Sequence, residues 1–117
     1  MDSGWAARVL GWGEGRAGRA YRGVDILARV QDPDGRIVEL TFERWGHIVV
    51  EHPELTPYRA QVMAAIEDPY ARLPGQRGNE LWYLLEKEGP SRWLQVVVAY
   101  EGERGWIVTA FARRRMP

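Results

Sequence analysis

The sequence predicts a small α+β domain: an N-terminal β-hairpin, two short helices and a three-stranded antiparallel meander, with the helices packed on one sheet face. Three observations predict this fold. Runs rich in β-branched and aromatic residues lie on both sides of the centre, two helical stripes lie between them, and the connections are short and turn-like. The 117 residues are enough for one hydrophobic core and too few for two.

The N-terminal part divides into an arm and a hairpin. Glycine, arginine and tryptophan over residues 1–23 favour no long regular element, so we expect a flexible arm there and one domain over residues 24–117. Two strand-like runs, Val24 to Val30 and Arg36 to Phe42, flank the sequence Asp32-Pro33-Asp34-Gly35. Because proline and glycine suit a tight turn, the two runs are predicted to form a hairpin.

Two helices are predicted next. An apolar stripe at i, i+3, i+4 and i+7 is formed by Trp45, Ile48, Val49 and His52. Pro53 ends this helix, since the residue before a proline avoids the helical region. Thr56 and Pro57 then suit the N-cap and first position of a second helix, which ends at Asp68-Pro69.

The predicted meander consists of Leu81 to Glu86, Trp93 to Tyr100 and Trp106 to Arg113, and an exposed loop over residues 74–79 leads into it. Strict alternation along the last strand assigns its residues to two faces. Ile107, Thr109, Phe111 and Arg113 are expected on one face, and Trp106, Val108 and Ala110 on the other.

Composition excludes several classes of function. The chain has no cysteine, which excludes disulfides, thiolate metal sites and a cysteine nucleophile. Sixteen basic residues balance sixteen acidic ones, so the overall charge does not steer the chain toward nucleic acid, although Arg113, Arg114 and Arg115 could form a local phosphate-attracting patch or a solvated tail. No apolar run is long enough to cross a bilayer, so we expect a cytoplasmic protein with no membrane partner.

Two histidines, His47 and His52, are the candidate acids or bases. They are about 140° apart around a helix, so they do not converge on one metal, and we predict neither a metal nor another cofactor. His52 continues the apolar stripe and could instead be a buried structural histidine. His47 lies off the stripe near Glu43 and Glu51, where an ordinary surface imidazole is the alternative.

Metal-independent cleavage of RNA requires a group that takes the proton from the 2′-hydroxyl, a donor for the leaving oxygen, and cations for the phosphate. Arginine, tyrosine and threonine suit the binding and orientation of phosphate, and the candidates are Arg77, Tyr83, Thr109 and Arg113. Each also has an ordinary interpretation as a loop, sheet-packing, strand or tail residue. No Gly-rich phosphate loop, GxSxG elbow or HExxH pattern supports another enzyme class.

Three segments, Arg44 to Leu55, Ala65 to Pro69 and Ile107 to Phe111, together resemble small phage and bacterial proteins grouped with the Barnase, EndoU, colicin and RelE nucleases. The resemblance covers roughly Thr41 to Arg114 and implies a helical segment packed on an antiparallel sheet. It points to a catalytic set of His47, His52, Arg77, Tyr83 and Thr109. Apart from the resemblance, we expect Arg113 and Arg114 to be substrate-binding cations. The group includes toxins, RNA-processing enzymes and proteins of no known activity.

The sequence therefore leaves three hypotheses. The first is a metal-independent endoribonuclease, phage-borne or toxin-like, that acts on RNA and has a protein antitoxin or another protein as partner. The second is a non-catalytic module that binds protein or nucleic acid, and the third is a structural or interaction protein with a degenerate site. Clustering of His47, His52 and Thr109 in one pocket would favour the first, whereas an apolar patch around Trp82, Trp93 or Trp106 would favour partner binding.

Overall fold

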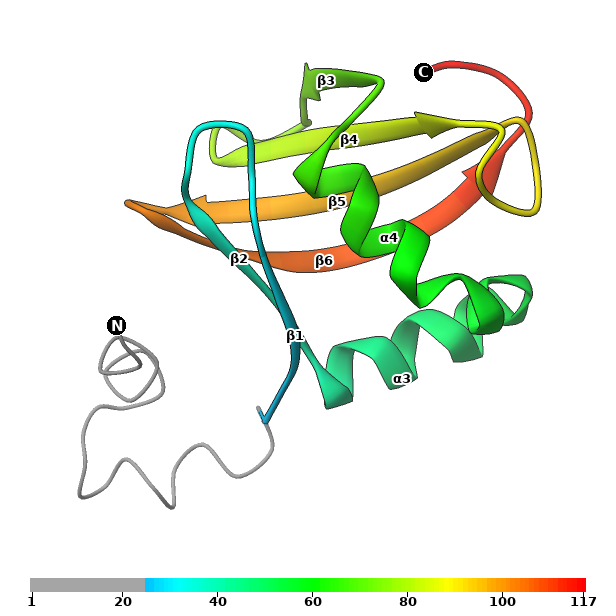
Figure 1. The fold of residues 1–117 in the computed structure, drawn as a ribbon, viewed down its shortest axis with the longest axis horizontal. Coiled ribbons are helices and arrows are strands. Elements are labelled where there is room, and N and C mark those ends of the chain that lie inside the picture. The colour runs from blue at the N-terminus through cyan, green and yellow to red at the C-terminus, as the bar shows by residue number, and fades with distance from the viewer. Residues whose placement is uncertain (1–24) are drawn as a thin grey trace.

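The computed structural model describes residues 25–117, so the predicted arm lies outside the described residues. These residues form a six-stranded mixed sheet in the order β1-β2-β6-β5-β4-β3, with helices packed on it (Figure 1). The elements in chain order are β1 (Ile26–Gln31), β2 (Ile37–Thr41), α3 (Phe42–Glu51), the 3-10 helix η2 (Pro53–Tyr58), α4 (Arg59–Glu67), β3 (Ala71–Pro74), β4 (Glu80–Glu86), β5 (Trp93–Glu101) and β6 (Arg104–Arg113). The predicted α+β class and order of hairpin, helices and strands are confirmed.

The hairpin and the C-terminal strands belong to one sheet. β1 and β2 pair antiparallel, as predicted, and β2 then pairs in parallel with β6 through Ile37, Val38 and Glu39. β6 therefore lies between β2 and β5 in the middle of the sheet. The meander of β4, β5 and β6 is antiparallel, as expected from its short connections.

One strand was missing from the prediction. β3, only four residues long, pairs antiparallel with β4 and forms the second edge of the sheet. Its sequence, Ala-Arg-Leu-Pro, lacks β-branched residues, and Pro74 suits an edge strand because it cannot donate to a ladder. The predicted meander of three strands is in fact a unit of four.

The first helix starts where the second strand ends. Thr41 is the N-cap of α3, and its hydroxyl accepts a hydrogen bond from the backbone N–H of Arg44. The predicted start of the second helix was wrong: Thr56 and Pro57 lie inside η2, which continues directly into α4 at Arg59. No helix within residues 25–117 is long and apolar enough to cross a membrane.

The hydrophobic core lies between the helices and one face of the sheet (Figure 1). Side chains of α3 and α4, among them Ile48, Val62 and Ile66, pack with every second residue of β5. The β5 residues on this face are Leu94, Val96, Val98 and Tyr100. The helices thus cover a single sheet face, as predicted.

A β-bulge changes the faces predicted for β6. Val97 pairs with Thr109 but Val98 pairs with Ile107, so Val108 is an extra residue in the ladder. Ile107 is therefore in the core on the helix-covered face with Ala110, and was wrongly grouped with Thr109. Thr109 and Arg113 share a face with each other, as expected, and also with Trp106.

Candidate functional site

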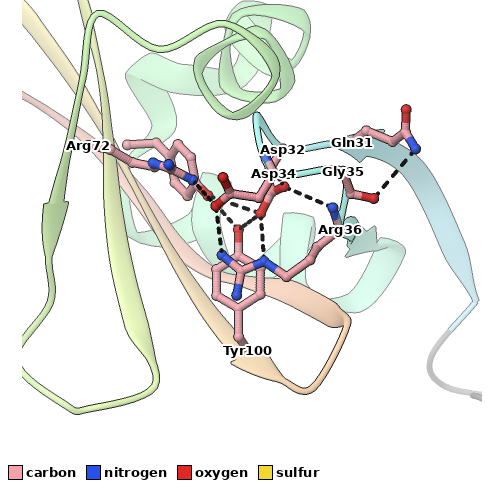
Figure 2. Close-up of polar contacts among 8 residues, drawn as sticks. Gln31, Asp32, Asp34, Gly35, Arg36, Arg72 and Tyr100 are labelled. Atoms are coloured by element: carbon pink, nitrogen blue, oxygen red, sulfur yellow. Dashed lines mark hydrogen bonds and ion pairs between the residues drawn. The ribbon is translucent and has the colours of Figure 1, made fainter.

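A partly buried group of polar side chains joins the tip of the β1–β2 hairpin to residues of β3, β4 and β5 (Figure 2). We call it the Asp32 cluster, and its members are Asp32, Asp34, Arg36, Arg72, Tyr83 and Tyr100. The Asp32 carboxylate, whose side chain is fully buried, accepts hydrogen bonds from the Tyr100 hydroxyl at 2.8 Å and from Arg36 Nε at 3.0 Å. The two tyrosine hydroxyls are hydrogen-bonded to each other at 2.5 Å.

The backbone of the hairpin turn supplies further hydrogen bonds to Asp32. Its Oδ1 accepts from the backbone N–H groups of Asp34 and Arg36, both at 2.9 Å, as expected of an aspartate that organises a turn. Burial opposes ionisation, but the Tyr100 hydroxyl, these N–H groups and the charge of Arg36 together hold the pKa of Asp32 below its usual range. Burial and the adjacent hydroxyl and carboxylate raise the pKa of Tyr100.

The cluster also ties together the two edges of the sheet. Arg72, on the edge strand β3, donates to Asp34 Oδ2 at 2.8 Å, and Asp34 belongs to the hairpin at the opposite edge. The Arg36 guanidinium lies 3.7 Å from the centre of the Tyr100 ring, so its charge is held by a carboxylate and an aromatic face together. The polar groups of the Asp32 cluster bond mainly to one another. We therefore interpret the cluster as a structural lock, meaning a set of contacts that holds the hairpin to the rest of the sheet.

The opposite side of the sheet carries the residues that could meet a ligand. We call it the second face, meaning the side of β4, β5 and β6 turned away from α3 and α4. Cross-strand pairing assigns the following residues to it: Glu80, Trp82, Leu84, Glu86, Trp93, Gln95, Val97, Ala99, Trp106, Thr109, Phe111 and Arg113. The β5 side chains here are buried, whereas most of those on β4 and β6 are partly exposed. This face therefore has a buried centre between more accessible strands.

His52, Thr109 and Arg113 each neighbour Phe111 at the β6 side of this face. The His52 ring lies 5.8 Å from the Phe111 ring, and Thr109 and Arg113 are the residues two before and two after Phe111 on the same face. Alternate residues of a strand are about 7 Å apart, so both are near neighbours of Phe111. His52 Nδ1 lies 3.8 Å from Glu54 Oε2, which can orient the ring.

Arg113 is fixed from one side. Its Nη1 donates to Gln95 Oε1 at 2.9 Å across the β5–β6 pair, and its buried Nε has no hydrogen-bond acceptor. A buried donor left without a partner costs free energy, so this guanidinium is incompletely satisfied by the protein. Sequence reasoning identified Arg113 but missed Gln95, whose position opposite Phe111 depends on the register of two strands.

The structure distributes the other predicted site residues elsewhere. Tyr83 is fully buried on the helix-covered face, in the Asp32 cluster. His47 is exposed on α3 in a shallow apolar depression with Glu43, Gly46 and Val50. Of the five predicted catalytic residues, His52 and Thr109 thus share Phe111 as a neighbour, and the depression beside His47 includes neither of them.

The two predicted loop and tail arginines are also separated. Arg77 is exposed before β4, near the end where Glu80 pairs with Ala99, whereas Trp93 and Arg113 mark the other end. Six residue steps along β4 separate these ends, which is about 20 Å. Arg114 is exposed directly after β6, at the same end of the sheet as Arg113.

Among the described residues, no group of three or more His, Asp or Glu side chains is arranged to hold a metal ion. Comparison with protein-family models, with curated proteins and with solved structures finds no match to this chain. Support for a function therefore comes from the geometry of the second face.

Proposed function

We propose that this chain is a metal-independent endoribonuclease whose catalytic groups lie on the second face beside β6. The observation that supports the proposal is the contact of the His52 ring with Phe111, between Thr109 and Arg113 on one strand face. This arrangement offers a proton-transfer group, a hydroxyl and a fixed cation, which are the groups that cleavage of RNA at a phosphate requires.

His52 is the acid and base in this proposal. Imidazole can accept the proton of the ribose 2′-hydroxyl and return a proton to the leaving 5′-oxygen at near-neutral pH. Since Nδ1 faces the Glu54 carboxylate, Nε2 is the nitrogen that exchanges the proton. Attack of the 2′-oxygen on phosphorus then yields a 2′,3′-cyclic phosphate and a free 5′-hydroxyl.

Arg113 stabilises the phosphate in this scheme. Gln95 fixes one arm of its guanidinium, which lowers the conformational freedom that phosphate binding would otherwise have to remove. Thr109 supplies a hydroxyl that can donate to a phosphate oxygen, and Arg114 adds positive charge at the end of β6. Tyr83 is assigned to the structural lock, while His47 and Arg77 lie outside the proposed catalytic group.

A second candidate function is supported by a different observation. Trp82, Trp93 and Trp106 all belong to the second face, each on a different strand. Aromatic side chains on one sheet face are a common surface for single-stranded nucleic acid or for a protein partner. The alternative is therefore a non-catalytic binding module that uses the same face.

The test is cleavage of a mixed-sequence RNA by the purified protein in the presence of EDTA. We expect cleavage by the wild type, loss of at least a hundred-fold in His52→Gln, and a smaller loss in Thr109→Val and Arg113→Gln. His47→Gln is the matched control, because it changes the other described histidine, which lies on α3 outside the proposed site, and should leave the rate unchanged. Circular dichroism of each variant checks the fold.

Two results would count against the enzyme. Retained activity in a folded His52→Gln variant would remove His52 from the mechanism. RNA binding without cleavage by the wild type would favour the binding module. Detection of a 2′,3′-cyclic phosphate on the products would support the proposed reaction specifically.

A further inference from the structure

Tyr70 is an aromatic residue that the core does not use. It is 61% exposed, between the end of α4 and the start of β3. Its position is nevertheless fixed, because its backbone N–H donates to the carbonyl of Leu84 at 2.7 Å. A large ring held at the surface by a rigid backbone can contact a ligand at little entropic cost.

The Tyr70 ring also has a firm support. It contacts the ring of Trp93 at a centroid distance of 5.2 Å and an interplanar angle of 62°, which is an edge-to-face arrangement. Trp93 is itself buried at the end of the second face. Since Tyr70 remains mostly exposed despite this contact, part of its ring is open to solvent and available for stacking.

Two arginines neighbour Trp93, the supporting ring of this pair. Trp93 is directly opposite Arg113 in the β5–β6 ladder, so the phosphate-binding residue of the proposed site is the cross-strand neighbour of the tryptophan that supports Tyr70. Arg92, the residue before Trp93, has its guanidinium 5.9 Å from the centre of the Trp93 ring and an ion pair to Glu86 at 2.6 Å. An exposed ring beside arginines matches the way proteins hold single-stranded nucleic acid, with bases on aromatic rings and phosphates on cations.

We propose that Tyr70, supported by Trp93, forms a subsite that stacks one unpaired base next to the phosphate bound by Arg113. This inference rests on the proposed function, because it takes the phosphate site of the ribonuclease as its starting point. In a duplex both faces of each base are covered by neighbouring base pairs, so the subsite accepts a nucleotide from a single strand or a loop. It thus selects unpaired RNA and excludes a continuous helix.

Binding and cleavage are to be measured separately. Binding uses fluorescence anisotropy of a labelled twelve-nucleotide RNA of mixed sequence, with the full chain carrying His52→Gln so that the probe stays intact. In that background Tyr70→Ala should weaken binding roughly five- to hundred-fold, whereas Tyr70→Phe, which keeps the ring, should bind like its parent. Phe42→Ala, which removes another exposed ring on α3, is the matched control and should have no effect.

The cleavage arm uses chains with His52 intact. Tyr70→Ala should slow cleavage of the single-stranded RNA by a similar factor and should leave the residual activity on the same sequence in a duplex unchanged. Equal binding of the single strand by Tyr70→Ala and its parent would overturn the stacking subsite, even if His52 proves essential for cleavage. Binding that depends on Tyr70 without any cleavage by the wild type would instead support the subsite and reject the ribonuclease. Absence of any RNA binding by the parent would reject both.

Discussion

The Tyr100 hydroxyl lies 2.8 Å from Asp32 Oδ2, although the two residues are 68 positions apart in the sequence. One belongs to the end of a central strand and the other to the tip of the hairpin. Their hydrogen bond, the one from Tyr83 to the same carboxylate and the position of Arg36 against the Tyr100 ring fix the hairpin to β4 and β5. The contact should therefore contribute to stability, and substitutions in the Asp32 cluster can measure that contribution.

Substitution of Tyr100 by phenylalanine should destabilise the protein by about 1–3 kcal/mol, because the buried Asp32 carboxylate and the Tyr83 hydroxyl both lose a partner. Urea denaturation followed by tryptophan fluorescence would measure the change. Tyr70→Phe is the matched control, since it removes a hydroxyl from an exposed ring and should change stability by a few tenths of a kcal/mol at most. Equal effects of the two substitutions would contradict the structural lock.

Because of the Asp32 carboxylate, the free energy of unfolding should fall as the solution becomes acidic. The pKa of Asp32 is lowered in the folded state, so its contribution is fully present above the pKa of the unfolded chain and is lost as the pH falls through the folded pKa. Denaturation midpoints between pH 7 and pH 3 should therefore fall less steeply for Asp32→Asn than for the wild type, although the variant should be less stable at pH 7. Parallel pH profiles for the two proteins would reject this role for Asp32.

The contribution of Glu39 on β2 to stability should depend on pH with the opposite sign. This residue is 8% exposed, and burial raises its pKa despite the hydrogen bond from Arg29 at 3.1 Å. A raised folded pKa means that the stabilising contribution is present below the unfolded pKa and lost as the pH rises through the folded one. Glu39→Gln should therefore gain stability relative to the wild type between pH 4 and pH 7. Thermal melts at both pH values measure the difference, and a constant difference would contradict it.

Two glycines should respond to alanine with opposite signs. A Cβ on Gly105 would lie 2.7 Å from Cε1 of Tyr100, which the Asp32 cluster holds in place, so Gly105→Ala should cost about 1–3 kcal/mol. A Cβ on Gly46 meets nothing within 4 Å, so Gly46→Ala should stabilise α3 by about 0.5–1 kcal/mol. Chemical denaturation of both variants checks the pair, and stabilisation by Gly105→Ala would show that Tyr100 is free to move.

Much of the fold could be predicted because its signals are local. The turn at Asp32-Pro33-Asp34-Gly35 and the β-branched and aromatic runs of β4 and β5 depend on neighbouring residues, and the structure confirms them. The parallel pairing of β2 with β6 has no such signal, since it joins segments more than sixty residues apart. The same holds for the bulge at Val108, which reversed the predicted face of Ile107.

The candidate site was harder to predict for the same reason. Tyr83 has the side chain of a phosphate-positioning residue, but its hydroxyl is in the Asp32 cluster because of hairpin residues some fifty positions earlier. Asp32 carried one usable signal, its place at the start of a turn, where aspartate caps the following N–H groups. Neither its burial nor its tyrosine partners could be inferred from that turn.

The central place of β6 has a consequence for biosynthesis. Every other described strand precedes β6 in the chain, yet among the described strands only β6 pairs with both the hairpin and β5. During translation the β1–β2 hairpin and the β3–β4–β5 ladder therefore emerge from the ribosome as two separate halves with unpaired edges. They can pair into one continuous sheet only after β6 has left the exit tunnel, so this interval is when the nascent chain is most open to aggregation or to a chaperone.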